Sequence, residues 1–281
     1  MEEIDQIRSA APTALTAPRF MTHKAAQLVS MAARVNLDAK DDDSHANLGW
    51  HRGFNGFLSH PIGEGENTVE VGLILDRFEV AIFRGAERLA SLSLEGVAVG
   101  DADAWLDAEL EKLALKPVSG QSPPYEMPAE ADAVETYSMA DRSESLAALS
   151  AWFSLSAAIL AEFAGRNSDL SPGPVRCWAH HYDLATEVHF EGVGTAKAAT
   201  IGIGFSPGDE HYDEPYFYIS PWSEIDVKDL PDPAVTGHWH TDGFVGIVAT
   251  ATEALSLGDI RRDLPAFIEG AFRMCREKLG V

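Results

Sequence analysis

The chain has 281 residues, 46% of them hydrophobic, and its 44 acidic residues outnumber its 21 basic residues, giving a net charge of −23 at pH 7. A surface of that sign repels phosphate backbones and anionic lipid, and no apolar run of about 18 residues is evident, so we expect neither nucleic acid nor a membrane as partner. The two cysteines, Cys177 and Cys275, form neither a disulfide framework nor a zinc knuckle, and the acidic first six residues do not fit a secretory signal, so the sequence predicts a cytoplasmic protein.

The first predicted segment is a flexible N-terminal arm at residues 1–19. Its alanines, prolines and threonines show neither a helical nor a strand period, and they offer little apolar surface to bury. We therefore expect the arm to contribute little to stability.

An N-terminal α+β lobe is predicted at residues 20–116. Apolar residues recur at spacings of three and four between Met21 and Val35, as in an amphipathic helix. Alternating apolar residues from 69 to 94 predict an antiparallel meander, and a second helical pattern then stops at Pro117. The order of elements is helix, sheet, helix.

A proline-rich segment at residues 117–137 shows little periodicity and is predicted to be a linker between two lobes. The C-terminal lobe at 138–281 repeats the order of the first, because a long helical pattern, a series of strands and a final helical pattern follow one another. The sequences of the segments at 48–58 and 175–190, where the strands of each lobe begin, also look alike, which suggests an internal duplication. The sequence therefore predicts an α+β fold of two helix-plus-antiparallel-sheet lobes.

The chemically interesting residues concentrate in the C-terminal lobe. Six of the ten histidines, with several carboxylates and many aromatic residues, lie between positions 178 and 240. Polar groups that converge within an aromatic wall are typical of small-molecule pockets. The ligand-binding candidates are Trp178, Asp183, Glu214, Tyr216, Tyr218 and Trp239.

Two pairs of residues in this region have the i, i+2 spacing that places side chains on one side of a strand. If residues 182–190 are extended, His181 and Asp183 share a face, and His238 and His240 do the same in their own segment. We predict that the two pairs meet in one site as metal ligands, and nitrogen with carboxylate suits zinc or iron. A metal-free pocket, or histidines that only satisfy a polar core, are the alternatives.

The segment Ala199–Phe205 alternates apolar residues with glycines. This pattern predicts a strand that another backbone or a ligand can approach closely. The following residues, Ser206 to Asp209, match a type II turn with proline second and glycine third. Neither a dinucleotide-binding fingerprint nor a serine nucleophile elbow fits this segment.

Three motifs, PVRCWAHHYDLATEVHF, GFSPGDEHYDEPYFYISPW and GHWHTDGF, resemble a family of uncharacterised bacterial proteins known only as a domain of unknown function. The resemblance covers most of the chain and is strongest from Val175 to Phe244. It implies no activity. More distant members look similar at Asp183 and Ala185 but lack the preceding histidine pair, so the resemblance favours Asp183 over His181 as a common feature.

The leading hypothesis for function is a protein that binds a small polar or cationic molecule in an aromatic pocket lined by histidine and carboxylate. The competing hypothesis is an enzyme that uses His181 or His240 as a general base beside Asp183, with or without a divalent metal. A third is a structural or partner-binding protein whose aromatic cluster is an interface hot spot. The sequence leaves the ligand and the oligomeric state open.

Overall fold

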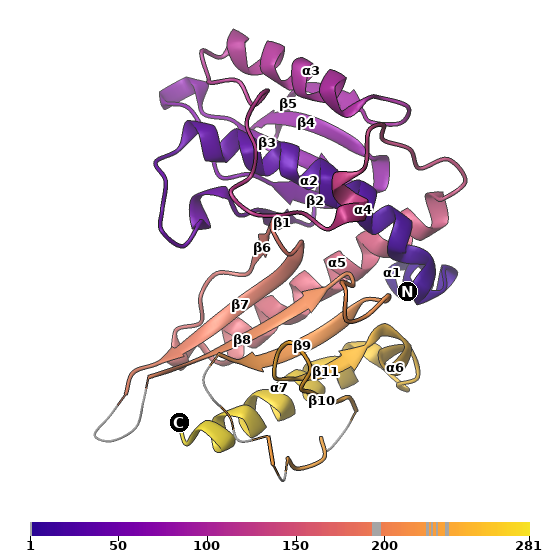
Figure 1. Ribbon diagram of the computed structural model, residues 1–281, viewed down its shortest axis with the longest axis vertical. Helices are drawn as coiled ribbons and strands as arrows, with labels where there is room; N and C mark the ends of the chain where they lie inside the picture. Colours follow the sequence, from indigo (N-terminus) through magenta and orange to yellow (C-terminus); the bar gives the residue numbers. More distant parts are fainter. Residues whose placement is uncertain (1, 193–197, 223–224, 226, 229, 234–235) are drawn as a thin grey trace. The chain divides into compact units, whose positions relative to one another are not determined.

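The structure, a computed structural model, describes residues 2–192, 198–222, 225, 227–228, 230–233 and 236–281. Within these residues the fold is α+β, with seven α-helices and two antiparallel sheets of five and six strands (Figure 1). The predicted fold class is confirmed.

The chain divides into two compact units at positions that differ from the predicted boundary. Unit 1 comprises residues 1–154 and 176–182, and unit 2 comprises residues 155–175 and 183–281. The predicted linker, 117–137, lies wholly within unit 1, where the backbone N–H of Val118 donates to the Asp107 carboxylate at 2.6 Å. A proline-rich coil that is hydrogen-bonded to its own domain has the same composition as a linker, so the sequence could not separate the two.

Unit 1 contains the described helices that precede the long helix α5, together with one complete sheet. Its elements are α1 (Glu2–Ser9), η1 (Pro12–Leu15), α2 (Thr16–Asn36), η2 (Ser44–Ala46), β1 (Gly49–His51), β2 (Gly56–Leu58), η3 (Gly65–Asn67), β3 (Glu70–Ile74), η4 (Leu75–Arg77), β4 (Glu79–Arg84), β5 (Glu87–Ser93), α3 (Val99–Lys112), α4 (Ala129–Asp132), the first half of α5 (Ser143–Arg166) and β6 (Arg176–Trp178).

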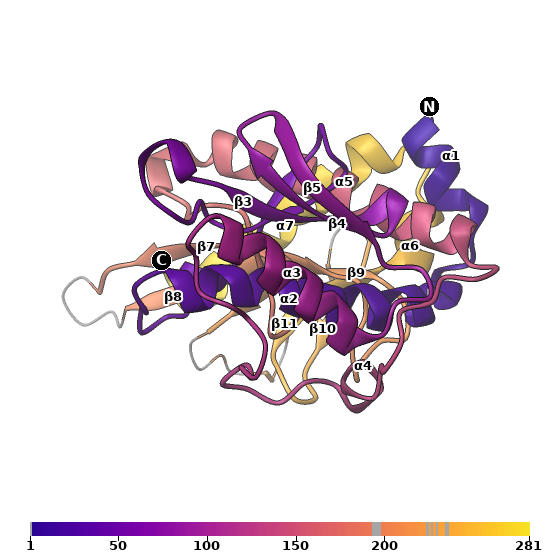
Figure 2. The same cartoon turned by 90° about the horizontal axis from the view of Figure 1, so that it is seen from above.

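The sheet of unit 1 is a simple antiparallel meander in the order β1-β2-β3-β4-β5, as the alternating pattern predicts. Phe57, Leu73 and Val80 lie opposite one another on three adjacent strands and are fully buried. Helices α2 and α3 lie on one face of this sheet (Figures 1 and 2). A smaller cluster around Phe83, with Phe54 packed against it, occupies the other face, so both faces carry apolar side chains.

The N-terminal residues are ordered, which differs from the expectation of a flexible arm. Residues 2–9 form α1, and α2 already begins at Thr16. Ile7 is 0% exposed and Leu15 is 1% exposed. Two isolated apolar residues are enough to fix this segment, but they are too few to produce a detectable helical period in the sequence.

Unit 2 contains the second half of α5 and the elements that follow. These are η5 (Ser168–Leu170), β7 (Asp183–Phe190), β8 (Ala199–Ser206), β9 (Tyr216–Pro221), β10 (His238–His240), β11 (Gly246–Thr250), α6 (Ala251–Leu255) and α7 (Ile260–Leu279). The strands of this unit lie in the order β10-β11-β9-β8-β7, and the sixth strand of the sheet, β6, belongs to unit 1.

The register of unit 2 sorts its strand residues onto two faces. The apolar face carries Leu184 and Val188 of β7, Ile201, Ile203 and Phe205 of β8, Phe217 and Ile219 of β9, and Ile247 and Ala249 of β11. Helix α7 packs on β8 and β9, where the Cys275 thiol lies 3.9 Å from the carbonyl oxygen of Ile219. The opposite face, named here the polar face, carries Asp183 and Glu187 of β7, Gly202, Gly204 and Ser206 of β8, Tyr216 and Tyr218 of β9, His238 and His240 of β10, and Thr250 of β11.

Helix α5 is, among the described residues, the one helix long and apolar enough to cross a membrane. Its most apolar stretch is 72% buried inside the protein, as is typical of a core helix. The helix contains no continuous apolar run of about 18 residues, because serines and Glu162 interrupt it, and most of its apolar surface packs inside the protein.

The two segments that look alike in sequence are paired with each other. Leu48 and Cys177 exchange backbone hydrogen bonds of 2.9 and 2.8 Å in an antiparallel bridge. Each half of the chain also has a helix, antiparallel strands and a helix in that order, although β11 returns between β9 and β10 in the second half. An internal duplication stays a prediction.

Because Leu15 is fully buried, Leu15→Ala is expected to lower the free energy of unfolding by about 2–4 kcal/mol through lost apolar contact and a residual cavity. Thr13→Ala, an exposed neighbour in the same 3-10 helix, is the matched control and is expected to change it by less than about 0.5 kcal/mol. Urea unfolding measures both. Equal, small effects of the two substitutions would show that the N-terminal segment is not packed.

Candidate functional site

On the polar face of unit 2, aromatic rings lie directly over the glycines of β8. A Cβ atom built on Gly204 would lie 2.4 Å from the hydroxyl oxygen of Tyr218, and one built on Gly202 would lie 2.8 Å from Nε1 of Trp222. The side chains of Tyr218 in β9 and of Trp222, which follows β9, therefore lie across β8, which is possible only where β8 has no side chains. The glycines predicted to admit a close neighbour do so, and that neighbour is the adjacent strand.

Tyr218 crosses β8 and reaches β7. Its hydroxyl donates a hydrogen bond to Oδ2 of Asp183, a carboxylate that is only 8% exposed. Burial, followed by the negative charge of Asp183, raises the pKa of the Tyr218 phenol well above its ordinary value. The phenol is therefore a neutral hydrogen-bond donor at pH 7.

A second tyrosine and carboxylate pair lies beside the first. The Tyr216 hydroxyl donates to Oδ2 of Asp209, and burial together with that carboxylate raises the pKa of Tyr216 far above its ordinary range. Oδ1 of Asp209 accepts the backbone N–H groups of His211 and Tyr212 at 2.8 and 3.2 Å, which fixes the loop after β8. The Tyr216 and Tyr218 ring centroids are 6.1 Å apart, so the two pairs form one continuous patch.

At the far edge of the same sheet, two histidines converge on a third tyrosine. Nε2 of His238 and Nδ1 of His240 each lie 2.9 Å from the Tyr212 hydroxyl oxygen. The Tyr212 ring packs at 4.8 Å from Tyr216, and the His240 ring stacks at 4.2 Å on Phe244. Burial, then the charges of Glu253 and Asp209, raises the pKa of Tyr212.

The outer ring nitrogens of both histidines also have acceptors. Nδ1 of His238 lies 3.3 Å from Oε1 of Glu253, and Nε2 of His240 lies 2.5 Å from the carbonyl oxygen of Asp242. The other carboxylate oxygen of Glu253 accepts the backbone N–H of Thr250 at 2.8 Å in the capping box of α6. The carboxylate that orients His238 is therefore itself fixed by a helix start.

The predicted common site of Asp183, His238 and His240 does not form. Strands β8, β9 and β11 lie between β7 and β10, which at about 4.8 Å per strand places the two about 19 Å apart. Among the described residues, no three His, Cys, Asp or Glu side chains are arranged to hold a metal ion. The i, i+2 spacing correctly predicts the faces within each strand, but it carries no information on strand order.

His181 and Trp178 belong to unit 1 rather than to the polar face. The backbone N–H of Tyr182 donates to the carbonyl of Trp178 at 2.7 Å, and Tyr182 has a φ of +57°. Residues 178–182 are therefore a tight turn, and β7 begins only at Asp183. The predicted alternation of His181 with Asp183 fails because a left-handed residue separates them.

Two further candidates have structural partners. Oε2 of Glu214 accepts the backbone N–H of Thr252 at 2.7 Å and its hydroxyl at 2.6 Å at the start of α6. Nε1 of Trp239 donates to the carbonyl of Pro231 at 2.8 Å, on the side of β10 opposite His238. Of the ligand-binding candidates, the structure brings together Asp183, Tyr216 and Tyr218.

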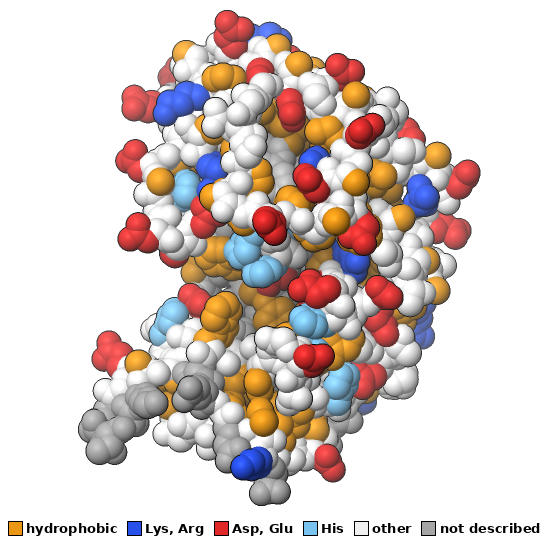
Figure 3. Space-filling view, viewed as in Figure 1, with side chains coloured by type: hydrophobic (Ala, Val, Ile, Leu, Met, Phe, Trp, Pro, Cys, Tyr) orange, Lys and Arg blue, Asp and Glu red, His pale blue; other side chains and the backbone are white. Residues whose placement is uncertain are grey.

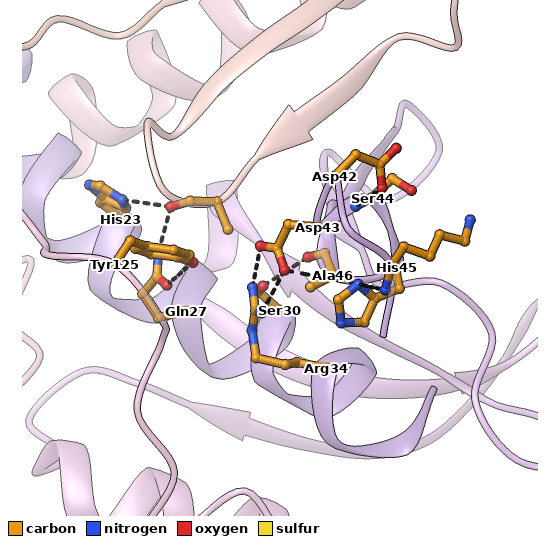
Figure 4. A network of polar contacts seen from close by, with 12 residues as sticks. His23, Gln27, Ser30, Arg34, Asp42, Asp43, Ser44, His45, Ala46 and Tyr125 are labelled. Atoms are coloured by element: carbon orange, nitrogen blue, oxygen red, sulfur yellow. Dashed lines mark hydrogen bonds and ion pairs between the residues drawn. The ribbon is translucent and has the colours of Figure 1, made fainter. Parts of the chain in front are cut away.

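A second polar cluster lies in unit 1, where helix α2 holds the 178–182 turn (Figure 4). The carbonyl of Ala179 accepts Nε2–H of His23 at 2.9 Å and Nε2–H of Gln27 at 2.5 Å, while the Tyr125 hydroxyl donates to the Gln27 side chain at 2.7 Å. Burial lowers the pKa of His23 to about 4, and burial followed by His181 lowers that of His180 to about 4. Both imidazoles are neutral at pH 7, and the hydrogen bonds of His23 and Gln27 hold the turn to α2.

Sequence reasoning missed Asp209, Tyr212, Trp222 and Glu253. The first two lie in an irregular loop, where no period indicates the direction of a side chain. Thr250 and Glu253 match the spacing of a capping box, so the helix start was detectable. The second role of Glu253, toward His238, depends on pairing between distant strands.

The chain matches no protein-family model, no curated protein and no solved structure. The arrangement of side chains is therefore the basis for any functional conclusion. Acidic side chains predominate over basic ones on the surface shown in Figure 3, in keeping with the net charge of −23.

Gly204→Ala is expected to push the Tyr218 ring aside and break its bond to Asp183, lowering the free energy of unfolding by about 1–3 kcal/mol. In a Tyr218→Ala background the same substitution is expected to cost less than about 0.5 kcal/mol, because the clashing ring is gone. Gly258→Ala, at a glycine whose Cβ would meet nothing within 4 Å, is the control. Additive costs in the double variant would contradict the role of Gly204.

The depressed pKa of His23 predicts a loss of stability in acid. Between pH 6.5 and about 4 the unfolded chain binds a proton at His23 that the folded chain does not, so the free energy of unfolding falls as pH falls through this window. The loss due to this group is about 3 kcal/mol, complete near pH 4. His23→Gln is expected to flatten that part of the profile, whereas His189→Gln, at an exposed imidazole, is expected to leave it unchanged. Parallel profiles for wild type and His23→Gln would count against the assignment.

Proposed function

We propose that unit 2 binds a small polar or cationic molecule on the polar face of its sheet, and that a small organic cation is the best fit. The observation that supports this most is the pairing of two neutral phenols with two carboxylates, Asp183 and Asp209, above a glycine floor. Phenols offer these carboxylates hydrogen bonds but no positive charge. The patch therefore keeps a negative potential that favours a cation.

The aromatic surface next to the carboxylates supports the same ligand class. The side chain of Trp222 lies along Gly202 and is 74% exposed, an unusual position for the largest aromatic residue. Indole and phenol faces attract ammonium groups, and the contact contributes about 0.5–1 kcal/mol at an exposed ring such as Trp222. An amine could therefore stack on Trp222 while its charge faces the carboxylates.

The cytoplasmic location also stands as a proposal. Cys177 and Cys275 are both buried, and burial raises the pKa of the Cys275 thiol to about 12. Two inert thiols are in keeping with a reducing compartment, where disulfides do not contribute to stability. The similarity to uncharacterised bacterial proteins remains a sequence-based expectation.

Titration calorimetry with alkylammonium compounds, and with neutral alcohols of the same shape, tests the proposed ligand class. Alkylammonium ions are expected to bind and the alcohols to bind at least about tenfold more weakly, a difference of roughly 1.4 kcal/mol. Asp183→Asn and Trp222→Ala are each expected to weaken binding by a similar factor. Glu277→Gln, which changes an exposed carboxylate of α7 on the opposite face of the sheet, is the matched control. Equal binding of alcohols, or no binding of any cation at millimolar concentration, would exclude this function.

A further inference from the structure

The cluster formed by Tyr212, His238 and His240 has the spacing of a metal-ligand set. Two donor atoms bound to one ion at about 2.0 Å are roughly 2.8–3.3 Å apart for octahedral or tetrahedral angles. Both imidazole nitrogens lie 2.9 Å from the Tyr212 oxygen, within this range. The Tyr212 oxygen therefore already stands at a ligand-to-ligand separation from each of the two nitrogens.

The outer hydrogen bonds assign the tautomers of the two histidines. Glu253 and the Asp242 carbonyl can only accept, so Nδ1 of His238 and Nε2 of His240 carry the protons. The inner nitrogens, Nε2 of His238 and Nδ1 of His240, are then left with lone pairs that both point at the Tyr212 oxygen. A carboxylate or a backbone carbonyl behind the outer N–H is the usual support of a metal-bound histidine.

Counting protons shows what the cluster lacks. Four polar contacts form a series that runs from Glu253 through His238, Tyr212 and His240 to the carbonyl of Asp242. Each contact needs one proton if it is to be a hydrogen bond. Neutral His238, Tyr212 and His240 supply three. One contact between Tyr212 and a histidine therefore lacks a proton, and a positive charge at that point, either a proton or a metal ion, removes the repulsion between the two lone pairs.

We propose that the Tyr212 oxygen, Nε2 of His238 and Nδ1 of His240 bind one divalent transition-metal ion, with Cu²⁺ or Zn²⁺ as the fitting class. Imidazole nitrogens select these ions over Mg²⁺ and Ca²⁺, which prefer oxygen ligands. The phenol proton leaves to solvent as the bond between oxygen and metal forms. The three protein ligands leave coordination positions for water or a small ligand.

The site is both preorganised and accessible. Backbone pairing of β10 with β11 holds the two histidines, the capping box fixes Glu253, and the bonds to Asp209 fix the loop that carries Tyr212. The His238 side chain is nevertheless 45% exposed. An ion can therefore enter from solvent without opening the sheet.

Titration of the full, tag-free chain with Cu²⁺ after chelator treatment tests the proposal. We expect one ion per chain and a charge-transfer absorption band from phenolate to copper. Tyr212→Phe keeps the ring but removes the oxygen, and it is expected to abolish the band and weaken Cu²⁺ binding by at least about tenfold. His240→Gln is expected to weaken binding by a similar factor.

Two controls match these variants in chemistry but lie outside the cluster. Tyr125→Phe removes a phenol of unit 1, and His189→Gln removes an exposed imidazole of β7. Both are expected to keep the band and the stoichiometry. Absence of stoichiometric Cu²⁺ binding by the wild-type chain, or a band that persists in Tyr212→Phe, would overturn the metal site.

The two proposals share only Asp209, which fixes the loop that carries Tyr212, and they are tested by different variants. The organic-cation patch depends on Asp183, Asp209 and Trp222, none of which is a ligand here. Asp183→Asn is therefore expected to leave the copper band unchanged, so failure of one proposal leaves the other testable.

Discussion

The polar face of unit 2 depends on the absence of one side chain. Gly204 lets the Tyr218 ring lie flat over β8, and only from that position does the hydroxyl reach Asp183 two strands away. A methyl group at 204 would occupy the place of the phenol. The burial of the Asp183 carboxylate, the raised pKa of the Tyr218 phenol and the flat aromatic surface all result from the missing side chain at Gly204, because each requires Tyr218 to lie across the sheet.

At the β10 edge of the sheet, the orientation of His238 depends on the capping box that begins helix α6. Thr250 and Glu253 form a capping box that begins α6, and one oxygen of Glu253 is used there. The remaining oxygen faces His238 and determines which of its nitrogens keeps a lone pair. A four-residue sequence motif thus controls the chemistry of a side chain on another strand. Such coupling links the start of a helix to the orientation of a candidate ligand.

What the sequence predicts well is periodic and local. The class of fold, the meander of the first half and the faces of β7 and β10 all follow from alternation, which depends only on neighbouring residues. Strand order does not follow from alternation. Strand β11 returns between β9 and β10, so that β11, β9 and β8 all lie between His240 and Asp183. The turn at Tyr182 was also hidden, since its positive φ occurs at a residue that normally favours strands. Tyr212 and Asp209 lie in irregular loops, where position is decided by long-range contacts.

The pairing of Leu48 with Cys177 has a consequence for synthesis on the ribosome. Leu48 is fully buried and exchanges both backbone hydrogen bonds with a residue 129 positions later in the chain. At bacterial or eukaryotic elongation rates that interval lasts on the order of 10 s. In the part of this interval that follows the synthesis of β5, the edge beside β1 has unpaired N–H and C=O groups although β2 to β5 are available to fold. Such an edge can recruit another strand, so chains that stop before residue 177 are expected to be the aggregation-prone products of this gene.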